Sequence, residues 1–442
     1  MTDSPAPTQH RQGWLNRVLN NLLLSVFVFL SILVIANIPL KLEFLNPIQN
    51  AFETFDLTDL VFSHFKKETT ADTNVVVVNI GTLHRGEVAE MLEILQAQSP
   101  AVIGIDAFFR QLHQDEERAA WDGALAMSLA QIEHLVMASE LPESHFKQKA
   151  KRYDSLEASH PLFMGQATTG FVNLITTGDK GEFVTVRAFS PQEKVKTSKD
   201  TYRSELAFAV QVANHIAPEK VKRFLARNND HEFVNFRGNQ DKFYVLDISN
   251  VFDPEADLSF LKGKAILLGY MGPHLGEISY IDRLFTPLNM DYLGRGSPDM
   301  YGVVVHANIV SMILAEEYIN EMPAWVNYLI AFGFCYFTVA LLSVVYRKLD
   351  FWFDAVAVVL QLALSLLFLT VVVLMFDWYR LRIDIGITIL SIFIAGFLIE
   401  IYFGIVDKVL ERSGLKKKTE ASPTAPGKSS AVSTTSNAPP TR

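Results

Sequence analysis

The sequence predicts an α/β protein with a mixed, largely parallel sheet flanked by helices, together with four transmembrane α-helices. Two observations predict this fold class. Between residues 74 and 269, short apolar runs alternate with stretches of helical spacing. Outside that region, four apolar stretches are each long enough to cross a bilayer core, which needs about 20 helical residues. At 442 residues with 49% hydrophobic residues, the chain has room for both parts.

Three buried strands give the clearest signal of the sheet. Residues 74–80 (NVVVVNI), 101–107 (AVIGIDA) and 264–269 (KAILLG) are continuous apolar runs of the type that fills a strand covered on both faces. Weaker patterns predict helices at 85–98, 119–131 and 202–216, a strand at 134–139, and an antiparallel edge at 232–236 and 243–248. Residues 140–200 are polar and show no clear period.

The four apolar stretches are residues 18–38, 325–346, 351–376 and 383–406. The positive-inside rule orients them, because basic residues precede the first span, separate the second from the third, and follow the fourth. These residues are Arg11, Arg17, Arg347, Lys348, Lys408, Arg412, Lys416, Lys417 and Lys418. We therefore expect a bacterial inner-membrane protein with both termini cytoplasmic and residues 40–324 as a periplasmic domain. Arg380 and Arg382 oppose the rule, and we expect them to be interfacial anchors.

The two ends of the chain have simple interpretations. Residues 1–17 are expected to form a short cytoplasmic segment. The span at 18–38 is predicted to remain as an anchor, because its apolar run is longer than that of a signal peptide and no small-x-small cleavage site follows it. The tail, 407–442, is rich in Ser, Thr, Pro, Ala and Lys without periodic apolar residues, and is predicted to be disordered.

Composition excludes several functional classes. A net charge of -9 gives no basic field that would collect nucleic acid. Cys335 is the only cysteine, so no intrachain disulfide and no cysteine-based zinc site can form. The sequence contains no H-E-x-x-H, Walker A or G-x-S-x-G motif. We expect no enzymatic activity, no cofactor and no metal, although a triad assembled in space leaves no sequence motif.

The ordered segments resemble a known family, the type-two cyclase/histidine-kinase-associated sensing extracellular domain (CHASE2). Glu53 and Asp56 lie in a helix predicted at 50–65, which either couples the membrane to the domain or only packs on the sheet. The other segments follow in the family's order: VVVVNI at 75–80, AVIGIDAFF at 101–109, LKGKAILLG at 261–269, DRLFTP at 282–287 and GVVVHAN at 302–308. Three spans after the domain also match, so the resemblance covers about residues 40–406.

The resemblance implies a sensory domain that often works as a dimer and is often fused to a cyclase or kinase. This chain resembles a stand-alone member. One departure concerns the end of the first strand, where the family usually has an acidic residue and this chain has Asn79. Any role of that acid is therefore not transferred.

Candidate ligand-binding residues follow the predicted strands. Asn79, Asp106, Gly269 and Gly272 lie at or just after strand ends, and ligands of open α/β sheets gather outside the carboxyl ends of the strands. The alternative interpretation is that Asp106 caps the next segment and that the glycines supply turn geometry.

Two family-matched residues complete the candidate site. Asp282 precedes Thr286 and Pro287, and either contributes to ligand binding or fixes a loop by accepting backbone N–H bonds. His306 lies at the start of a predicted helix at 303–314. It is either a ligand or a pH-sensitive group, or a satisfied core histidine. No second ligand follows it at helical spacing, so a metal pair is not predicted.

The predicted function is a membrane-anchored sensory domain that binds an unknown ligand or partner and relays its state to a separate membrane or cytoplasmic effector. The alternative is a structural or assembly subunit of an envelope complex, which would show a large exposed apolar patch. A hydrolase or transferase is the third possibility. The expected partners are the lipid bilayer, an effector or envelope protein, and a second copy of the chain.

Overall fold

The structure, a computed structural model, describes residues 7–37, 62, 70–142, 144, 146–147, 151–176, 185–198, 201–277, 279–289, 297–349 and 352–412. It divides into two compact units. The α/β unit comprises residues 39–327 and 366–385, and the helical unit comprises 1–38, 328–365 and 386–442. The predicted helix at 50–65, except for Phe62, and the tail after residue 412 lie outside the described residues.

A seven-stranded sheet forms the centre of the α/β unit. Six of its strands run side by side in parallel, and β6 pairs antiparallel with β3. In spatial order the strands are β12 (Phe243–Leu246), β1 (Asp72–Asn79), β13 (Ala265–Gly269), β2 (Val102–Asp106), β3 (Leu135–Glu140), and then β7 (Thr168–Phe171) and β6 (Glu157–Ala158), which both pair with β3. The prediction of a mixed, largely parallel sheet is confirmed.

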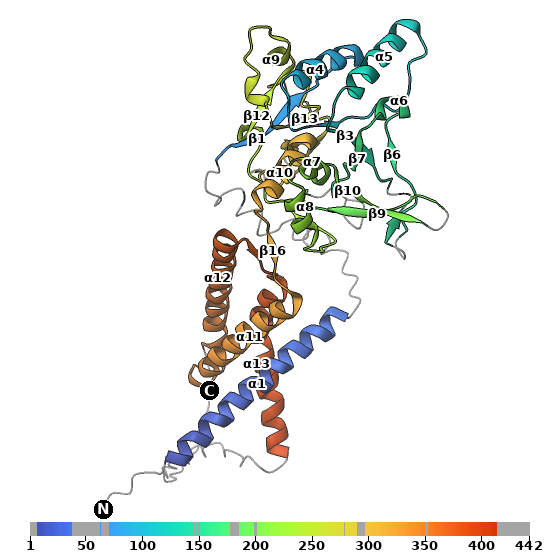
Figure 1. The fold of residues 1–442 in the computed structure, drawn as a ribbon. Helices are drawn as coiled ribbons and strands as arrows, with labels where there is room; N and C mark the ends of the chain where they lie inside the picture. Colours follow the sequence, from blue (N-terminus) through green and yellow to red (C-terminus); the bar gives the residue numbers. More distant parts are fainter. Residues whose placement is uncertain are drawn as a thin grey trace, which may run out of the picture. The chain divides into compact units, whose positions relative to one another are not determined.

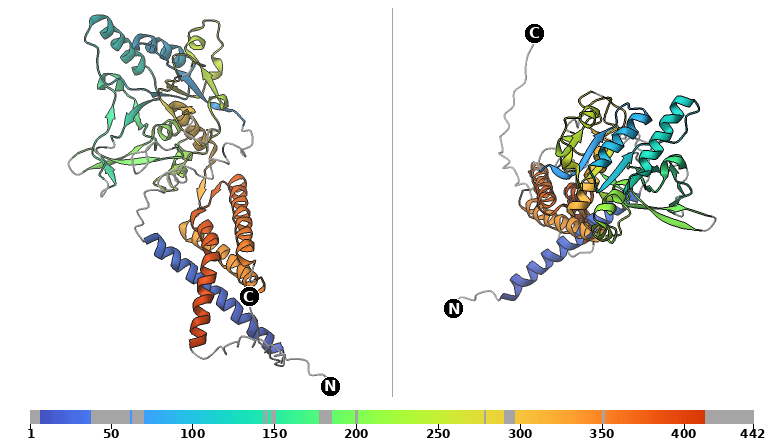
Figure 2. Two further views of the ribbon diagram at one scale, coloured as in Figure 1. Left: turned by 180° about the vertical axis from the view of Figure 1, so that it is seen from behind. Right: turned by 45° about the horizontal axis from the view of Figure 1, so that its top comes forward.

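Helices cover both faces of this sheet. Successive side chains of a strand point to opposite faces of the sheet. Val76 and Val78 therefore pack against α4 (Arg85–Ala97) and α5 (Glu116–Ala130), while Val75 and Val77 face the other layer. That layer contains α7 (Phe208–Ile216) and α10 (Gly302–Ala315). Figure 1 shows the two pairs on opposite sides of the sheet, and Figure 2 shows the same layers from behind. Burial on both faces explains the continuous apolar runs.

The helix predicted at 202–216 is wrong in part. It begins only at Phe208, because the preceding segment forms strand β10 (Tyr202–Leu206) in a separate four-stranded sheet with β9 (Gln192–Lys196), β5 (Arg152–Tyr153) and β4 (Phe146–Lys147). That sheet occupies the region where the sequence shows no clear period.

The predicted antiparallel edge is also wrong. β12 is an edge strand but runs parallel to β1, and β11 (Glu232–Phe233) pairs instead with β8 (Ala188–Phe189) in a small sheet of its own. Closeness in sequence favours a hairpin, but the two strands find partners in other parts of the domain. Tertiary pairing therefore overrides the local signal.

Among the described residues, three helices are long and apolar enough to cross a membrane: α11 (Ala324–Lys348), α12 (Phe353–Tyr379) and α13 (Gly386–Arg412). In α13 the apolar stretch runs from Gly386 to Phe403. These helices correspond to three of the four predicted spans. The first predicted span lies on α1 (Pro7–Asn37), whose described apolar part, Arg17–Ile32, is shorter than the other three. α13 extends to Arg412, into residues predicted as tail.

The helical unit has an apolar core and a polar link between α12 and α13. Val28 of α1, Cys335 of α11 and Ile399 of α13 are buried together. Gln361 of α12 donates hydrogen bonds to the carbonyl oxygens of Ile392 (2.7 Å) and Phe393 (2.8 Å) on α13. Side-chain amides of this kind stabilise helix pairs where no water is available.

Candidate functional site

Neighbouring strands bring three of the predicted site residues into one row. Asn79 of β1 lies beside Gly269 of β13, which in turn lies beside Asp106 of β2. The first turns of α10 cross this row. A Cβ atom on residue 269 would lie 2.6 Å from the Cβ of Val303, so only glycine allows the helix to approach the strand this closely. Gly269 therefore serves helix packing rather than turn geometry.

The same part of α10 gathers three titratable side chains, Asp106, Asp282 and His306, which we call the acid cluster. His306 Nε2 lies 4.0 Å from an oxygen of Asp106, and the Asp282 carboxylate rests against Gly302 at the start of α10. Asp282 has a positive φ of 58°, and its carbonyl oxygen accepts a hydrogen bond from the Gly302 N–H (3.0 Å). Two residues 24 positions apart and a third from β2 thus meet at one strand end.

The acid cluster is electrostatically unusual. Burial, and then the nearby Asp282 charge, raise the pKa of Asp106 to about 7. Partial burial of its carboxylate raises the pKa of Asp282 to about 6, and burial lowers the pKa of His306 to about 4. His306 is therefore neutral near pH 7, and the cluster holds two carboxylates that compete with each other for charge.

Neither carboxylate is neutralised within the described part of the chain. No Lys or Arg there forms an ion pair with Asp106 or Asp282, and neither side chain accepts a hydrogen bond. The prediction that Asp106 caps the next segment is therefore not supported. Asp282 accepts a backbone N–H bond through its carbonyl oxygen and not through its carboxylate. Within the described structure, both carboxylates are therefore free to accept hydrogen bonds from a bound ligand or partner.

Asn79 and Gly272, by contrast, have complete structural roles. The Asn79 amide donates to Asp247 (2.9 Å) and to the Gly272 carbonyl (3.1 Å), and its oxygen accepts from the N–H groups of Gly81 (2.9 Å) and Met271 (2.8 Å). This uses the full bonding capacity of the side chain. Gly272 has a φ of 97°, which favours glycine. Both residues fix the loops around the acid cluster.

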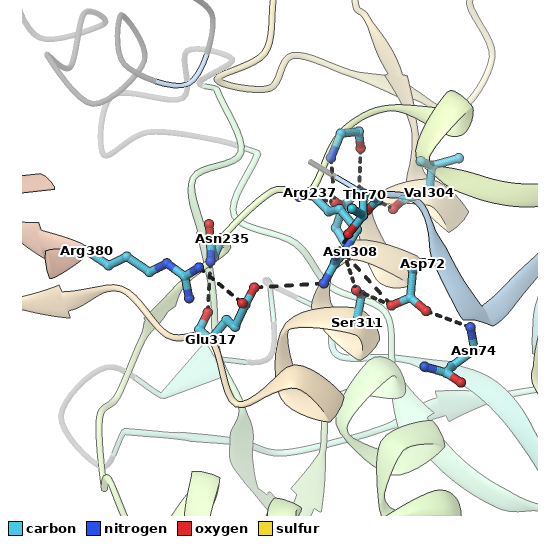
Figure 3. Close-up of polar contacts among 11 residues, drawn as sticks. Thr70, Asp72, Asn74, Asn235, Arg237, Val304, Asn308, Ser311, Glu317 and Arg380 are labelled. Carbon is cyan, nitrogen blue, oxygen red and sulfur yellow. Dashed lines mark hydrogen bonds and ion pairs between the residues drawn. The ribbon is translucent and has the colours of Figure 1, made fainter. Parts of the chain in front are cut away.

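A second polar network lies at the opposite end of β1, and sequence reasoning missed it. Asp72, the first residue of that strand, accepts hydrogen bonds from the Ser311 hydroxyl and from the Asn74 N–H (2.7 Å) and lies 4.0 Å from Arg237. Asn308 of α10 accepts from the Arg237 N–H (2.7 Å). Figure 3 shows these side chains converging on α10.

This network continues to the turn between α12 and α13. Glu317, just after α10, pairs with Arg380 (3.2 Å) and with Arg237 (3.8 Å), as Figure 3 shows. β16 (Asn320–Glu321) then runs parallel to β17 (Leu381–Arg382), and Arg382 pairs with Glu321 at 2.7 Å. We call Asp72, Arg237, Asn308, Ser311, Glu317 and Arg380 the turn network.

The two arginines predicted as interfacial anchors thus have partners within the protein. Phe376, near the end of α12, also belongs to the core of the α/β unit, where it packs against Phe62 with ring centroids 5.5 Å apart. In the sequence, the contacts of this turn were signalled only by Arg380 and Arg382, two basic residues that oppose the positive-inside rule. Their partners, Glu317 and Glu321, carried no signal of their own.

Within the described ranges, no group of three or more His, Cys, Asp or Glu side chains is placed to hold a metal ion. Cys335 is buried in the helical unit.

A comparison with protein families matches the CHASE2 domain over residues 33–345. The match covers well over half of the chain, and the chain belongs to this family of sensory extracellular domains. No curated protein and no solved structure matches it. The family resemblance seen in the sequence is confirmed, and the three apolar helices indicate association with a membrane.

Proposed function

We propose that the protein is a membrane-anchored sensory receptor without enzymatic activity, whose α/β unit binds a ligand or partner and whose helices relay the bound state to a separate effector. The acid cluster is the observation that carries this proposal. Titratable side chains without partners, at the carboxyl end of a parallel sheet, are typical of binding sites in this fold class.

The α10 helix supports a physical route for the relay. Its first turns lie over the acid cluster, its later turns carry Asn308 and Ser311 of the turn network, and the chain continues through β16 into α11. A helix of 14 residues is about 21 Å long and moves as a rigid rod. A ligand that favours one position of α10 would therefore also act on the turn between α12 and α13.

The energy required for such a relay is modest. A ligand shifts the balance between two conformations only by its difference in affinity for them, and a coupling of about 1–3 kcal/mol is sufficient. Each contact at the turn is weaker than this, because a partly exposed ion pair such as that of Arg380 and Glu317 contributes about 0.5 kcal/mol. Such contacts can break and form again without unfolding the domain.

The proposed topology places the α/β unit in the periplasm, four spans in the bacterial inner membrane, and both termini in the cytoplasm. The basic residues near Arg347 and after the last span support it by the positive-inside rule. α1 is included as the first span, since its helix of 31 residues is long enough to cross a bilayer core.

A pull-down of the intact protein from its native membrane in mild detergent tests the relay. Co-purifying proteins are identified by mass spectrometry, with an unrelated multi-pass membrane protein as bait control. Reproducible recovery of a kinase, cyclase or regulator subunit supports the receptor. Recovery of envelope structural proteins alone, or of nothing, contradicts it and favours the assembly-subunit alternative.

The variant Arg382→Gln is a matched second bait. It removes the Arg382–Glu321 pair of the β16–β17 contact while leaving the acid cluster intact. If the relay runs through this turn, the variant recovers the same effector, but ligand no longer alters the effector's activity.

A further inference from the structure

The acid cluster combines excess negative charge with a buried imidazole that forms no hydrogen bond among the described residues. In the neutral tautomer that carries its proton on Nδ1, the nitrogen facing Asp106, Nε2, is the acceptor. His306 is 3% exposed, and its Nδ1 atom has no hydrogen-bond partner in the described structure. Its ring edge packs on Phe208 with centroids 5.2 Å apart, so the imidazole is held in place by an apolar contact rather than by polar ones. A buried polar group without a partner is costly, and in native proteins it calls for an explanation.

The distance between His306 and Asp106 points to what is missing. At 4.0 Å, His306 Nε2 and the Asp106 oxygen are too far apart for a direct hydrogen bond. They are close enough to bond to one shared nitrogen placed between them, since each such bond is about 2.9 Å long. The Asp282 carboxylate, whose charge acts on Asp106, is a third acceptor on the same side of α10.

We propose that the acid cluster binds the ammonium group of a small organic amine, which would be the ligand of the receptor described above. A primary ammonium group has three N–H donors and one positive charge. The cluster offers three acceptors, two carboxylates and a histidine nitrogen, and no described Lys or Arg pairs with it. This assignment rests on the proposed sensory function and names its ligand class.

Metal ions and anions fit the cluster less well. Calcium takes six to eight oxygen ligands and magnesium six in near-octahedral geometry, whereas no three-ligand metal group occurs among the described side chains. An anion would be repelled by both carboxylates. Tyr280 and Ile281, directly before Asp282, are 62% and 68% exposed and offer apolar surface to the carbon skeleton of an amine.

Amine binding of this kind must depend on pH in a defined direction. The titratable groups facing Asp106 are His306 from α10 and Asp282 from the loop before β14 (Arg283–Leu284), and no described Lys or Arg lies within ion-pair distance. Since the pKa of free Asp106 is about 7, a cation must displace a proton below that pH. Affinity is then expected to fall about tenfold per pH unit as the pH drops below 7.

The test is calorimetric titration of the full-length protein in detergent with n-butylamine, using 1-butanol as the neutral analogue of the same shape. We expect butylamine to bind and butanol not to bind at pH 8. Asp106→Asn and Asp282→Asn should each weaken butylamine binding about tenfold or more, because each removes a charge-assisted hydrogen bond. Glu116→Gln, an exposed carboxylate on α5, is the matched control and should leave binding unchanged.

Three results would overturn the amine assignment: equal binding of butylamine and butanol, no effect of either Asn variant, or binding of Ca²⁺ at the cluster in place of butylamine. Asp282 lies on an exposed loop, so its variant tests the cluster independently of any change in stability caused by Asp106→Asn. Because purified protein is used, a failed titration alongside a recovered effector rejects the ligand and not the receptor. Amine binding without any effector rejects the relay and leaves a binding domain.

Discussion

The two ends of β1 and its neighbours carry similar side chains in opposite electrostatic states. At the amino end, Asp72 is buried and accepts hydrogen bonds from Ser311 and Asn74, with Arg237 close by. At the carboxyl end of β2, which is separated from β1 by β13, Asp106 forms no hydrogen bond among the described side chains and lies 4.0 Å from His306. Both carboxylates lie against the same helix, α10, so burial alone does not distinguish them.

This difference indicates that Asp72 has a structural role, whereas Asp106 is available to bind a ligand. A buried carboxylate that has its hydrogen bonds and a cation is already satisfied and contributes to stability. One that lacks them costs free energy, and the fold retains that cost only where something else supplies the missing partner. Three substitutions are expected to separate the two ends, with effects of different size.

The largest effect is expected at the satisfied end. Asn308→Ala removes the acceptor of the Arg237 and Gly238 N–H groups and the donor to the Gly238 and Val304 carbonyls. Because Asn308 is fully buried, these backbone groups lose their partners at a cost of about 3 kcal/mol. Thermal unfolding of the full chain in detergent, followed by tryptophan fluorescence, should shift down by roughly 6–12 °C. The control Asn74→Ala, at an exposed position of β1, should shift it little.

A smaller effect of opposite sign is expected at the unsatisfied end. The folded pKa of Asp106, about 7, lies above its ordinary value of 3.8, so the folded state binds the proton more tightly and its carboxylate destabilises the fold above pH 7. Asp106→Asn should therefore stabilise the protein by about 2 kcal/mol at pH 8.

The control for this prediction is to measure the stability of wild type and Asp106→Asn at several pH values. Below pH 4 the wild-type carboxyl is protonated in both states, so the benefit of Asp106→Asn should shrink steadily between pH 8 and pH 5. Unfolding midpoints of wild type and variant measured across that range provide the readout. A difference that does not change with pH, or a destabilised variant at pH 8, would show that Asp106 is satisfied like Asp72.

The smallest effect is expected where the turn network reaches the turn between α12 and α13. The side chains of Arg380 and Glu317 are 41% and 42% exposed, and exposed pairs contribute about 0.5 kcal/mol. Arg380→Gln should move the unfolding midpoint by no more than roughly 2 °C. A fall comparable to that of Asn308→Ala would mean that this contact is part of the stable core and is too strong to act in a relay.

Much of the fold could be predicted because its signals are local. The runs at 74–80, 101–107 and 264–269 gave strands β1, β2 and β13 to within two residues, since a strand buried on both faces must be apolar throughout. The three later spans were predictable for the same reason, as a bilayer requires about 20 apolar residues. Residues 202–206 were misread because a polar strand in a small separate sheet has no apolar run to mark it.

The candidate site could be predicted only in outline. The rule that ligands gather at the carboxyl ends of strands selected Asp106 and its neighbours, and the family resemblance added Asp282 and His306. No pattern could show that Asn79 is saturated with hydrogen bonds while the Asp106 side chain accepts none from the residues that the structure describes. That distinction depends on which loops arrive at each strand end, and those loops come from residues more than 150 positions away along the chain.

The sequence by itself determined the class of the protein: an α/β sensory domain of the CHASE2 family, with apolar helices after it, because apolar periodicity and segment order are written along the chain. Only the tertiary structure decided which polar residues are partners. It brought Asp282 and His306 to Asp106, and Glu317 to Arg380, since hydrogen bonds and charge pairs act over a few ångströms in space and leave no period in the sequence.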